Sequence, residues 1–289
     1  TSILERDKIN IILSTPHQDS VRYTKRNVLW QHLSYDDDSL APMTNKGFIN
    51  AIDAQVYVSH WQYEKFRYIL QIPLHSAHVI RNAIEPIDFV ERSKSDKIRL
   101  IYTSTPWRGL EEVLDTFELL GRDDIELDVY SSTILYGSGF AEFAGDKFEP
   151  IFDRAREMPG VNYHGCVTND EVKTALQSAH IFAYPSVFQE TACLAMIEAG
   201  ASGCSLVTTN LGALPETGLG YNRMTTFQSS REEMVAAYAR DLTEVIDTYW
   251  DLSTQERIRQ QSARFNQHYD WALVAQEWER LFDRLTIES

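Results

Sequence analysis

Short runs of apolar and β-branched residues alternate with longer amphipathic stretches from Ile98 onward. Runs of strand length that alternate with amphipathic helices are typical of βαβ units around a buried parallel sheet. Strands are expected at Ile98–Tyr102, Glu126–Tyr130, Val161–His164, Ile181–Tyr184 and Leu206–Thr209, and helices at Leu110–Leu120, Asp146–Met158, Asp170–Ala179 and Leu194–Ala201. The pattern predicts a doubly wound α/β domain.

Two regions flank this domain. The N-terminal region also has an α/β pattern, with strands expected at Ile9–Leu13, Val28–Trp30, Val56–Ser59 and His78–Ile80 and a helix from Trp61 to Leu70. The C-terminal region is helical, with helices expected at Glu232–Tyr249, Thr254–His268 and Trp271–Leu285. In the last helix an apolar stripe recurs every three or four residues, at Trp271, Val274, Trp278, Leu281, Phe282 and Leu285. Such a stripe requires a partner surface.

The length of 289 residues favours two domains, because a typical domain has about 100–150 residues. Pro86 and the polar run 91–97 suggest a linker between them. We therefore expect a first domain over residues 1–88, a second over 89–268, and a terminal helix over 269–289. Apolar residues make up 43% of the chain, which is enough for buried cores and excludes global disorder.

The net charge of −15 argues against a nucleic-acid partner. Three cysteines without a CxxC pair support neither a disulfide framework nor a zinc site, and they favour a reducing compartment such as the cytoplasm. No apolar run is long enough to span a membrane. The first residues, Thr1 to Ile3, lack an initiator Met, which suggests an upstream segment.

Two glutamates eight residues apart are the most informative chemical feature. Glu190 follows an expected strand and Glu198 lies in the next helix. The intervening helix start, Thr191, Ala192, Cys193 and Leu194, offers backbone amides and a helix dipole to a phosphate. Carboxylates accept several hydroxyl donors at once, as a sugar or a ribose requires. The simpler alternative is a capping Glu190 and a solvated Glu198, but the small, apolar residues around Glu198 argue against it.

This segment resembles the Glu-x7-Glu segment of the GT-B retaining glycosyltransferases, the group-1 or GT4-like family. The run from Tyr102 to Leu110 resembles the family's loop after the first strand of the donor domain, which places Arg108 at the phosphate-binding position. Further matching segments, in the family's order, are Arg81–Ile84, Tyr163–Val167 and Leu211–Glu216. The Asn27–His32 run resembles the acceptor-domain strand that ends in a histidine facing the donor sugar.

The resemblance implies two Rossmann-like doubly wound domains, the N-terminal one abbreviated, with the last helix crossing back to the N-terminal domain. It implies transfer of a sugar, with retention, from a nucleoside-diphosphate sugar to a glycan or lipid-linked acceptor, without metal or other cofactor. His32, Glu190 and Arg108 take catalytic roles. The donor-binding positions are Ser104, Thr105, Arg108, Gly165, Val167, Thr191, Ala192, Cys193, Leu194 and Glu198.

Three departures from the family pattern keep other functions open. Thr103 stands where many members carry a second basic residue, Thr191-Ala192-Cys193 replaces the usual Gly-Phe-Gly, and the N-terminal region is short. These departures allow a catalytically weak or inactive fragment that binds a nucleotide or a partner. A nucleotide-sugar epimerase of the same fold is a further alternative, although no clear second acid/base pair accompanies the two glutamates.

Several other features are assigned structural roles. Asp36–Asp38 imitates a metal-binding Asp-x-Asp motif but is expected to be a solvated loop. His75 and His78 are expected at the surface, and Cys193 is expected to be a small packed residue. The aromatic and basic residues from Trp61 to Tyr68 would suit a glycan or weak membrane association, yet their helical spacing favours packing.

Overall fold

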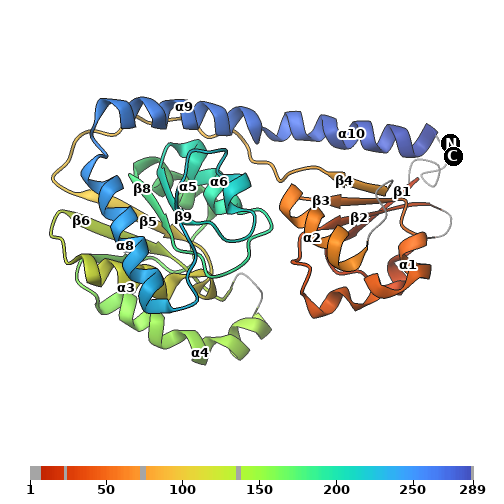
Figure 1. Cartoon of the computed structure of the whole chain (residues 1–289), viewed down its shortest axis with the longest axis horizontal. Helices are drawn as coiled ribbons and strands as arrows, with labels where there is room; N and C mark the ends of the chain where they lie inside the picture. The colour runs from red at the N-terminus through yellow and green to blue at the C-terminus, as the bar shows by residue number, and fades with distance from the viewer. Residues whose placement is uncertain (1–7, 23–24, 72–75, 135–137, 288–289) are drawn as a thin grey trace. The chain divides into compact units, whose positions relative to one another are not determined.

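The computed structural model describes residues 8–22, 25–71, 76–134 and 138–287 (Figure 1). The chain forms two compact units. The first comprises Thr1–Ala83, Glu190–Ala192 and Tyr269–Ser289, and the second comprises Ile84–Gln189 and Cys193–His268. The first division therefore lies after Ala83 rather than after residue 88, and a three-residue segment around Thr191 leaves the second unit.

The first unit contains a four-stranded parallel sheet in the order β1-β2-β3-β4. Its strands are Ile9–Leu13, Arg26–Gln31, Ala54–Tyr57 and Ala77–Val79. Because side chains alternate along a strand, β2 sends Leu29 to one face and Val28 to the other. The Leu29 face packs with Phe48 of α1 (Lys46–Asn50) and Phe66 of α2 (His60–Leu70). Short 3₁₀ helices, η2 (Gln18–Ser20) and η3 (Asp38–Thr44), complete this unit's connections.

The opposite face of this sheet is covered by α10 (Trp271–Ile287), the last helix of the chain. Val274, Leu281 and Leu285 pack with Val28 and Val56 of the sheet. The Trp278 ring meets Trp30 edge-on at 4.9 Å between centroids, and Arg81 forms a 2.8 Å salt bridge with Glu277. Trp271 departs from the expected stripe because it lies at the helix start and is 57% exposed.

The second unit contains a six-stranded parallel sheet in the order β10-β9-β8-β5-β6-β7. The strands are β5 Ile98–Thr103, β6 Ile125–Tyr130, β7 Val161–Tyr163, β8 Ile181–Tyr184, β9 Ser205–Thr209 and β10 Arg223–Thr225. The chain first adds strands on one side of β5 and then continues on the other side. The strand order therefore reverses between β5 and β8.

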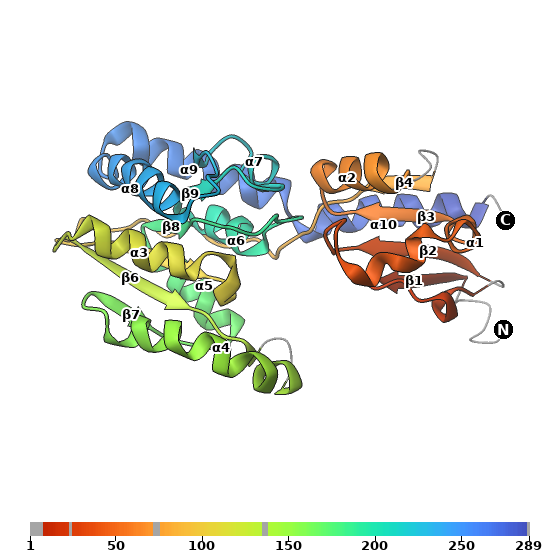
Figure 2. The ribbon, with the colours of Figure 1, turned by 60° about the horizontal axis from the view of Figure 1, so that its bottom comes forward.

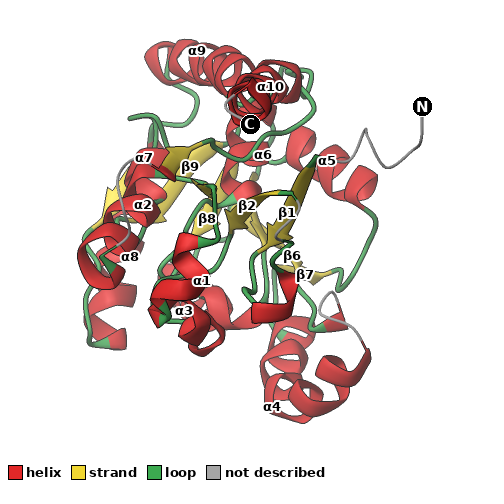
Figure 3. Ribbon diagram, turned by 90° about the vertical axis from the view of Figure 1, so that its right-hand side faces the viewer, coloured by secondary structure: helices red, strands yellow, loops and turns green. Residues whose placement is uncertain are grey.

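Helices flank this sheet on both sides, as Figure 2 and Figure 3 show. Helix α3 packs against α4 and α8, whereas α6 packs against α5 and α9. Their bounds are α3 Leu110–Leu120, α4 Ser138–Glu157, α5 Asn169–Ser178, α6 Leu194–Ser202, α8 Arg231–Asp247 and α9 Leu252–His268; shorter helices are η5 Pro106–Arg108 and α7 Leu214–Thr217. None of the helices in the described residues is long and apolar enough to cross a membrane.

The segment from Pro86 to residue 97, which is expected to be a linker, is attached to the second unit by hydrogen bonds. The Ile87 amide donates to the Asn266 side chain (2.7 Å), and Asn266 donates back to the Ile87 carbonyl (2.9 Å). Arg92 donates to the carbonyls of Leu176 (2.9 Å) and Ser202 (3.0 Å), at the carboxyl ends of α5 and α6. Because a guanidinium satisfies several carbonyls at once, Arg92 ties this segment to both helices.

Candidate functional site

The loops that follow β5 and β8 touch at the point where the strand order reverses. Open α/β sheets bind ligands at such a point, outside the carboxyl ends of their strands. Gly109 has a φ of +109°, and a Cβ atom at this position would lie 2.4 Å from the carbonyl oxygen of Pro185. Another residue would be strained at this φ and would collide with Pro185. The glycine therefore permits the close contact between the two loops.

Arg108 ends η5 in the first of these loops. Its guanidinium carbon lies 4.7 Å from the centre of the Phe188 ring, in the second loop. A cation above an aromatic ring is attracted by the ring's quadrupole, and the contact restrains the long arginine side chain. The expected phosphate-binding cation is thus held between the two loops.

Ser104 and Thr105, whose amides are expected to face a phosphate, directly follow β5. The Ser104 amide donates to the Tyr130 carbonyl (3.2 Å), so the pairing of β5 with β6 continues one residue beyond Thr103. The Ser104 hydroxyl lies 3.3 Å from the Tyr184 hydroxyl, and Thr105 is buried. The Ser104 amide is therefore bonded to the sheet, and the role of both residues toward a phosphate stays a prediction.

Helix α6 begins at the residue that the sequence predicts. Its first residue is Leu194, and Cys193 is the N-cap residue, without a side-chain hydrogen bond to the helix. The amides of the first turn of a helix have no partner within the helix, so they remain donors for a ligand at this edge of the sheet. Thr191 and Ala192 precede the helix and belong to the first unit. Leu194 thus belongs to the helix start, whereas Thr191 and Ala192 do not.

Glu198 lies in the second turn of α6 and is half-buried. Burial raises the pKa of its carboxyl group, and the charge of Lys173 lowers it to a smaller extent. Among the described residues Glu198 forms no salt bridge. A half-buried carboxylate without an ionic partner is costly, unless a bound hydroxyl donor satisfies it.

Glu190 and His32 belong to the first unit. Glu190 is only 2% exposed, and the hydroxyl of the next residue, Thr191, donates to the His32 carbonyl (2.9 Å). His32 follows β2, and its ring lies 4.7 Å from that of Trp30. Burial lowers the pKa of His32, and its Nε2 atom has no hydrogen-bond partner among the described residues. The structure thus brings together Thr191 and His32, two residues far apart in sequence.

The loop with the expected donor-binding positions Gly165 and Val167 follows β7. The preceding His164 stacks on Tyr130, with ring centres 4.3 Å apart and an interplanar angle of 6°. Its Nε2 atom lies 2.9 Å from a carboxylate oxygen of Asp128. The predicted site residues did not include Tyr130, His164 or Phe188, although all three lie in segments that the sequence analysis considered. Their position directly after or near the ends of predicted strands was the available signal.

The family model for the group 1 glycosyl transferases matches residues 99–246, which is just over half of the chain. The chain belongs to the group 1 glycosyltransferases. The matched range includes Arg108, Glu190 and Glu198, together with every strand of the second sheet except the first residue of β5.

Two named proteins are similar in sequence to this group 1 glycosyltransferase. One subunit of the human phosphatidylinositol N-acetylglucosaminyltransferase is 24% identical over 215 residues, which cover 73% of this chain and 42% of the human protein. The gpi3 subunit of the same enzyme from Schizosaccharomyces pombe is 27% identical over 125 residues, which cover 43% of this chain and 26% of the yeast protein. The chain therefore spans less than half the length of these relatives.

Solved structures share the fold. Sucrose-phosphate synthase from Thermosynechococcus elongatus superposes with a TM-score of 0.74 at 13% identity, covering 98% of this chain and 74% of that chain. HepE from Anabaena, in complex with UDP-glucose, superposes with a TM-score of 0.68 at 14% identity, covering 95% and 79%. The fold of this glycosyltransferase is therefore the predicted GT-B type.

The other candidate residues of this glycosyltransferase occupy ordinary structural positions. Asp37 is exposed and caps η3 by accepting a 2.9 Å hydrogen bond from the Ser39 amide. His78 lies half-buried in β4 rather than at the surface, and burial lowers its pKa. His75 lies outside the described residues. In the part of the chain that the structure describes, no three His, Cys, Asp or Glu side chains gather as metal ligands would.

In α2 the aromatic residues divide between packing and exposure. Phe66 is buried in the core of the first unit, as the helical spacing predicts, whereas Tyr68 is 70% exposed. Lys65 lies over the rings of Tyr35 and Trp61, at 5.6 and 5.7 Å from their centres. Cys193 is buried at the start of α6, as expected for a packed residue.

Proposed function

We propose that the chain transfers a sugar from a nucleoside-diphosphate sugar to a glycan or lipid-linked acceptor, with retention of anomeric configuration and without a metal. The observation that carries this proposal is the position of Arg108, which lies against Phe188 at the reversal point of the sheet. A cation fixed there would stabilise the negative charge that grows on the leaving diphosphate. Electrostatic stabilisation of this kind is usually the largest catalytic contribution.

The remaining parts of a donor site support the same function. The first-turn amides of α6 are oriented donors for phosphate oxygens, and Glu198 is a half-buried acceptor for ribose hydroxyls. The family resemblance gives His32 a catalytic role, and burial lowers the pKa of its ring. Retention rests on the family resemblance alone.

The names of the similar proteins guide the choice of substrates. HepE was crystallised with UDP-glucose, and the human relative is named for N-acetylglucosaminyl transfer to phosphatidylinositol. UDP-glucose and UDP-N-acetylglucosamine are therefore the first donors to examine, and a lipid-linked acceptor is the first acceptor class. GDP and ADP sugars are the comparison set.

Calorimetric titration of the full chain with UDP, GDP and ADP, with and without EDTA, tests the donor site. We expect one nucleotide to bind regardless of EDTA, and Arg108→Gln to weaken it about tenfold or more, since it loses a charge-assisted contact. Arg122→Gln is the matched control, because Arg122 pairs with Asp124 and Asp247 on the surface. Absence of nucleotide binding, or binding that requires a divalent metal, would contradict the proposal.

A second candidate is a nucleotide-binding protein that does not turn over its donor. Thr103, buried at the end of β5, replaces the second basic residue that many members of the family carry. Fewer cations would balance the diphosphate, so the leaving group would be less activated. Hydrolysis of UDP-sugars distinguishes the two candidates: turnover above background by the chain supports the transferase, whereas tight binding without turnover supports the second candidate.

A further inference from the structure

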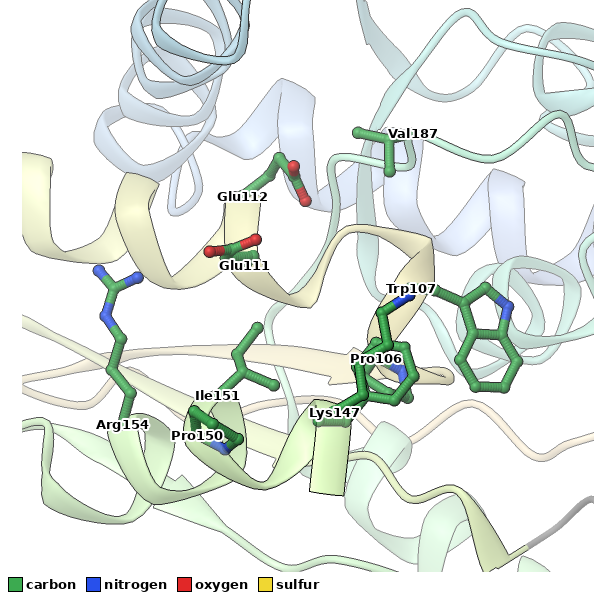
Figure 4. A pocket seen from close by; sticks show the side chains of 10 residues that line it. Pro106, Trp107, Glu111, Glu112, Lys147, Pro150, Ile151, Arg154 and Val187 are labelled. Carbon is green, nitrogen blue, oxygen red and sulfur yellow. The ribbon is translucent and has the colours of Figure 1, made fainter. Parts of the chain in front are cut away.

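A cavity of about 360 Å³ lies in the second unit between α4 and the segment formed by η5 and α3. Figure 4 shows the side chains that line it. The residues that matter for its chemistry are Trp107, Glu111, Glu112, Lys147, Phe148 and Arg154. Val187, from the loop after β8, also lines it and lies above the other labelled side chains in this view. Nothing in the donor-site prediction uses this cavity.

Aromatic rings form one wall of the cavity. The rings of Trp107 and Phe148 lie 5.6 Å apart between centres at an angle of 46°. The Lys147 ammonium lies 5.3 Å from the centre of the Phe148 ring. Prolines and an isoleucine extend this wall, so its surface is apolar and rigid. Such a wall suits the flat apolar face of a ring-shaped ligand.

The charges around the cavity balance one another. Glu111 forms a 2.7 Å salt bridge with Arg231, and Arg154 forms 2.6 and 2.7 Å salt bridges with Asp115 and Glu118. Glu112 is half-buried, and among the described residues it forms no salt bridge. Burial raises the pKa of its carboxyl group. Since Glu111 and Glu112 balance Lys147 and Arg154 among the lining residues, the cavity has no excess positive charge for a phosphate, whereas the Glu112 carboxylate suits the hydroxyl groups of a neutral ligand.

We propose that this cavity is a second carbohydrate site, which binds a neutral mono- or disaccharide. The ring of the sugar packs on Trp107 and Phe148, and the Glu112 carboxylate accepts two neighbouring hydroxyl groups. The volume lies within the range of about 300–1,000 Å³ that is usual for small-molecule sites. The proposal does not depend on the donor site, because Arg108 and Glu198 do not line this cavity.

The cavity shares its loops with the donor site. Trp107 precedes Arg108, and Val187 precedes Phe188, so each loop turns one side chain toward the cavity and the next toward the Arg108–Phe188 contact. A saccharide that restrains Trp107 and Val187 therefore restrains the neighbouring pair. Coupling between two sites is reciprocal, so a bound saccharide and a bound nucleotide must change each other's affinity by the same factor.

Saturation-transfer NMR and titration of the full chain with glucose, N-acetylglucosamine, maltose and cellobiose test the site, without any nucleotide. We expect at least one of these sugars to bind at millimolar concentration. Glu112→Gln and Trp107→Ala should each weaken it about tenfold. Glu157→Gln, an exposed carboxylate at the end of α4, is the matched control and should leave the affinity unchanged.

Three outcomes would overturn the proposal. The first is that none of the four sugars binds. The second is that a sugar binds equally well to wild type and to a folded Glu112→Gln variant. The third is that inorganic phosphate binds to the cavity and that Lys147→Gln abolishes this phosphate binding. Trp107→Ala requires a circular dichroism spectrum, since it removes a large packed ring, and Glu112→Gln provides the conservative test if Trp107→Ala does not fold. Failure of nucleotide binding would affect the proposed function but not this one.

Discussion

At the scale of single residues, the two glutamates of the Glu-x7-Glu segment have different environments. Glu190 is buried in the first unit, whereas Glu198 is half-buried in α6 of the second unit. The two residues carry the same carboxyl side chain, but Glu198 is more exposed to solvent than Glu190. Glu198 is the better candidate for a ligand that enters from solvent.

Glu198→Gln should change stability and binding in opposite directions. Burial raises the pKa of Glu198 in the native state. At a pH between the ordinary pKa and the raised pKa, the native state therefore binds more protons than the unfolded state. Its contribution to the free energy of unfolding is therefore lost as pH rises through that window. At pH 7 the variant should melt at a higher temperature than wild type without nucleotide, yet show a smaller nucleotide-induced shift. Thermal scans at pH 5 and pH 7 measure both effects.

The control for that variant is Glu157→Gln, which should change the free energy of unfolding by less than about 0.5 kcal/mol, as for most surface substitutions, and leave the nucleotide-induced shift unchanged. If Glu198→Gln kept the full nucleotide-induced shift, Glu198 would not contact the nucleotide.

Gly109→Ala tests the contact between the two loops of the donor site. The new methyl group would meet the Pro185 carbonyl at 2.4 Å and would be held at a positive φ. Gly220→Ala is a matched control, because Gly220 has a φ of +80° but no atom within 4 Å of the added Cβ. Strain alone costs about 1–3 kcal/mol, so Gly109→Ala should lose clearly more unfolding free energy than Gly220→Ala in urea titrations. Equal losses would mean that the loops separate easily.

At the scale of elements, the carboxyl ends of α5 and α6 depend on one side chain from outside both helices. The last carbonyls of a helix lack partners within the helix and carry partial negative charge. Arg92 donates to Leu176 near the end of α5 and to Ser202 at the end of α6. A segment without regular structure thereby joins two helices that flank the candidate site.

Arg92→Met should therefore destabilise the second unit. A hydrogen bond from a charged group contributes about 1.5–3 kcal/mol, and several are lost together, so we expect a loss of at least about 2 kcal/mol. Arg259→Met is the comparison, because Arg259 pairs with the exposed Glu91 in solvent and should contribute much less to the free energy of unfolding than Arg92. Chemical denaturation followed by circular dichroism measures both; a similar, small loss in each would show that solvent replaces Arg92 at the helix ends.

At the scale of the whole molecule, two units carry separate cores, and the last helix belongs to the first of them. The sheet of the first unit has α1 and α2 on one face and α10 on the other. The stability of the N-terminal residues therefore depends on residues at the opposite end of the chain.

Leu281→Ala should destabilise the first unit while leaving nucleotide affinity of the second unit unchanged. Leu281 is 1% exposed in the cluster beneath α10, and such truncations typically cost about 2–5 kcal/mol. Leu273→Ala, on the same helix but 44% exposed, should cost less than about 1 kcal/mol. Calorimetric unfolding and a UDP titration of each variant give the comparison; equal melting of the two variants would contradict the assignment of α10 to the core.

The sequence predicts the second sheet well, because β5 and β8 are mostly apolar runs and β6 alternates apolar and polar positions. Strand β8 has the expected bounds, and β5 differs by one residue. Strand β10 is missed because Arg223 and Met224 are exposed at the sheet edge and carry no apolar pattern. Local sequence also does not predict the burial of Glu190, because the neighbouring Thr191 forms a hydrogen bond to His32, which is 159 positions away. Local periodicity identifies elements, whereas the environment of a site residue depends on distant contacts.

The return of α10 to the first unit has a consequence for biosynthesis. Residues 84–268 emerge from the ribosome as one nearly continuous block, and they can form their sheet as soon as they are made. The first unit is synthesised earlier, but one face of its sheet, with Val28 and Val56, stays uncovered until the residues of α10 have emerged from the ribosome. The unit that is made first is therefore completed last, and during this interval its apolar face is open to chaperones and to other nascent chains.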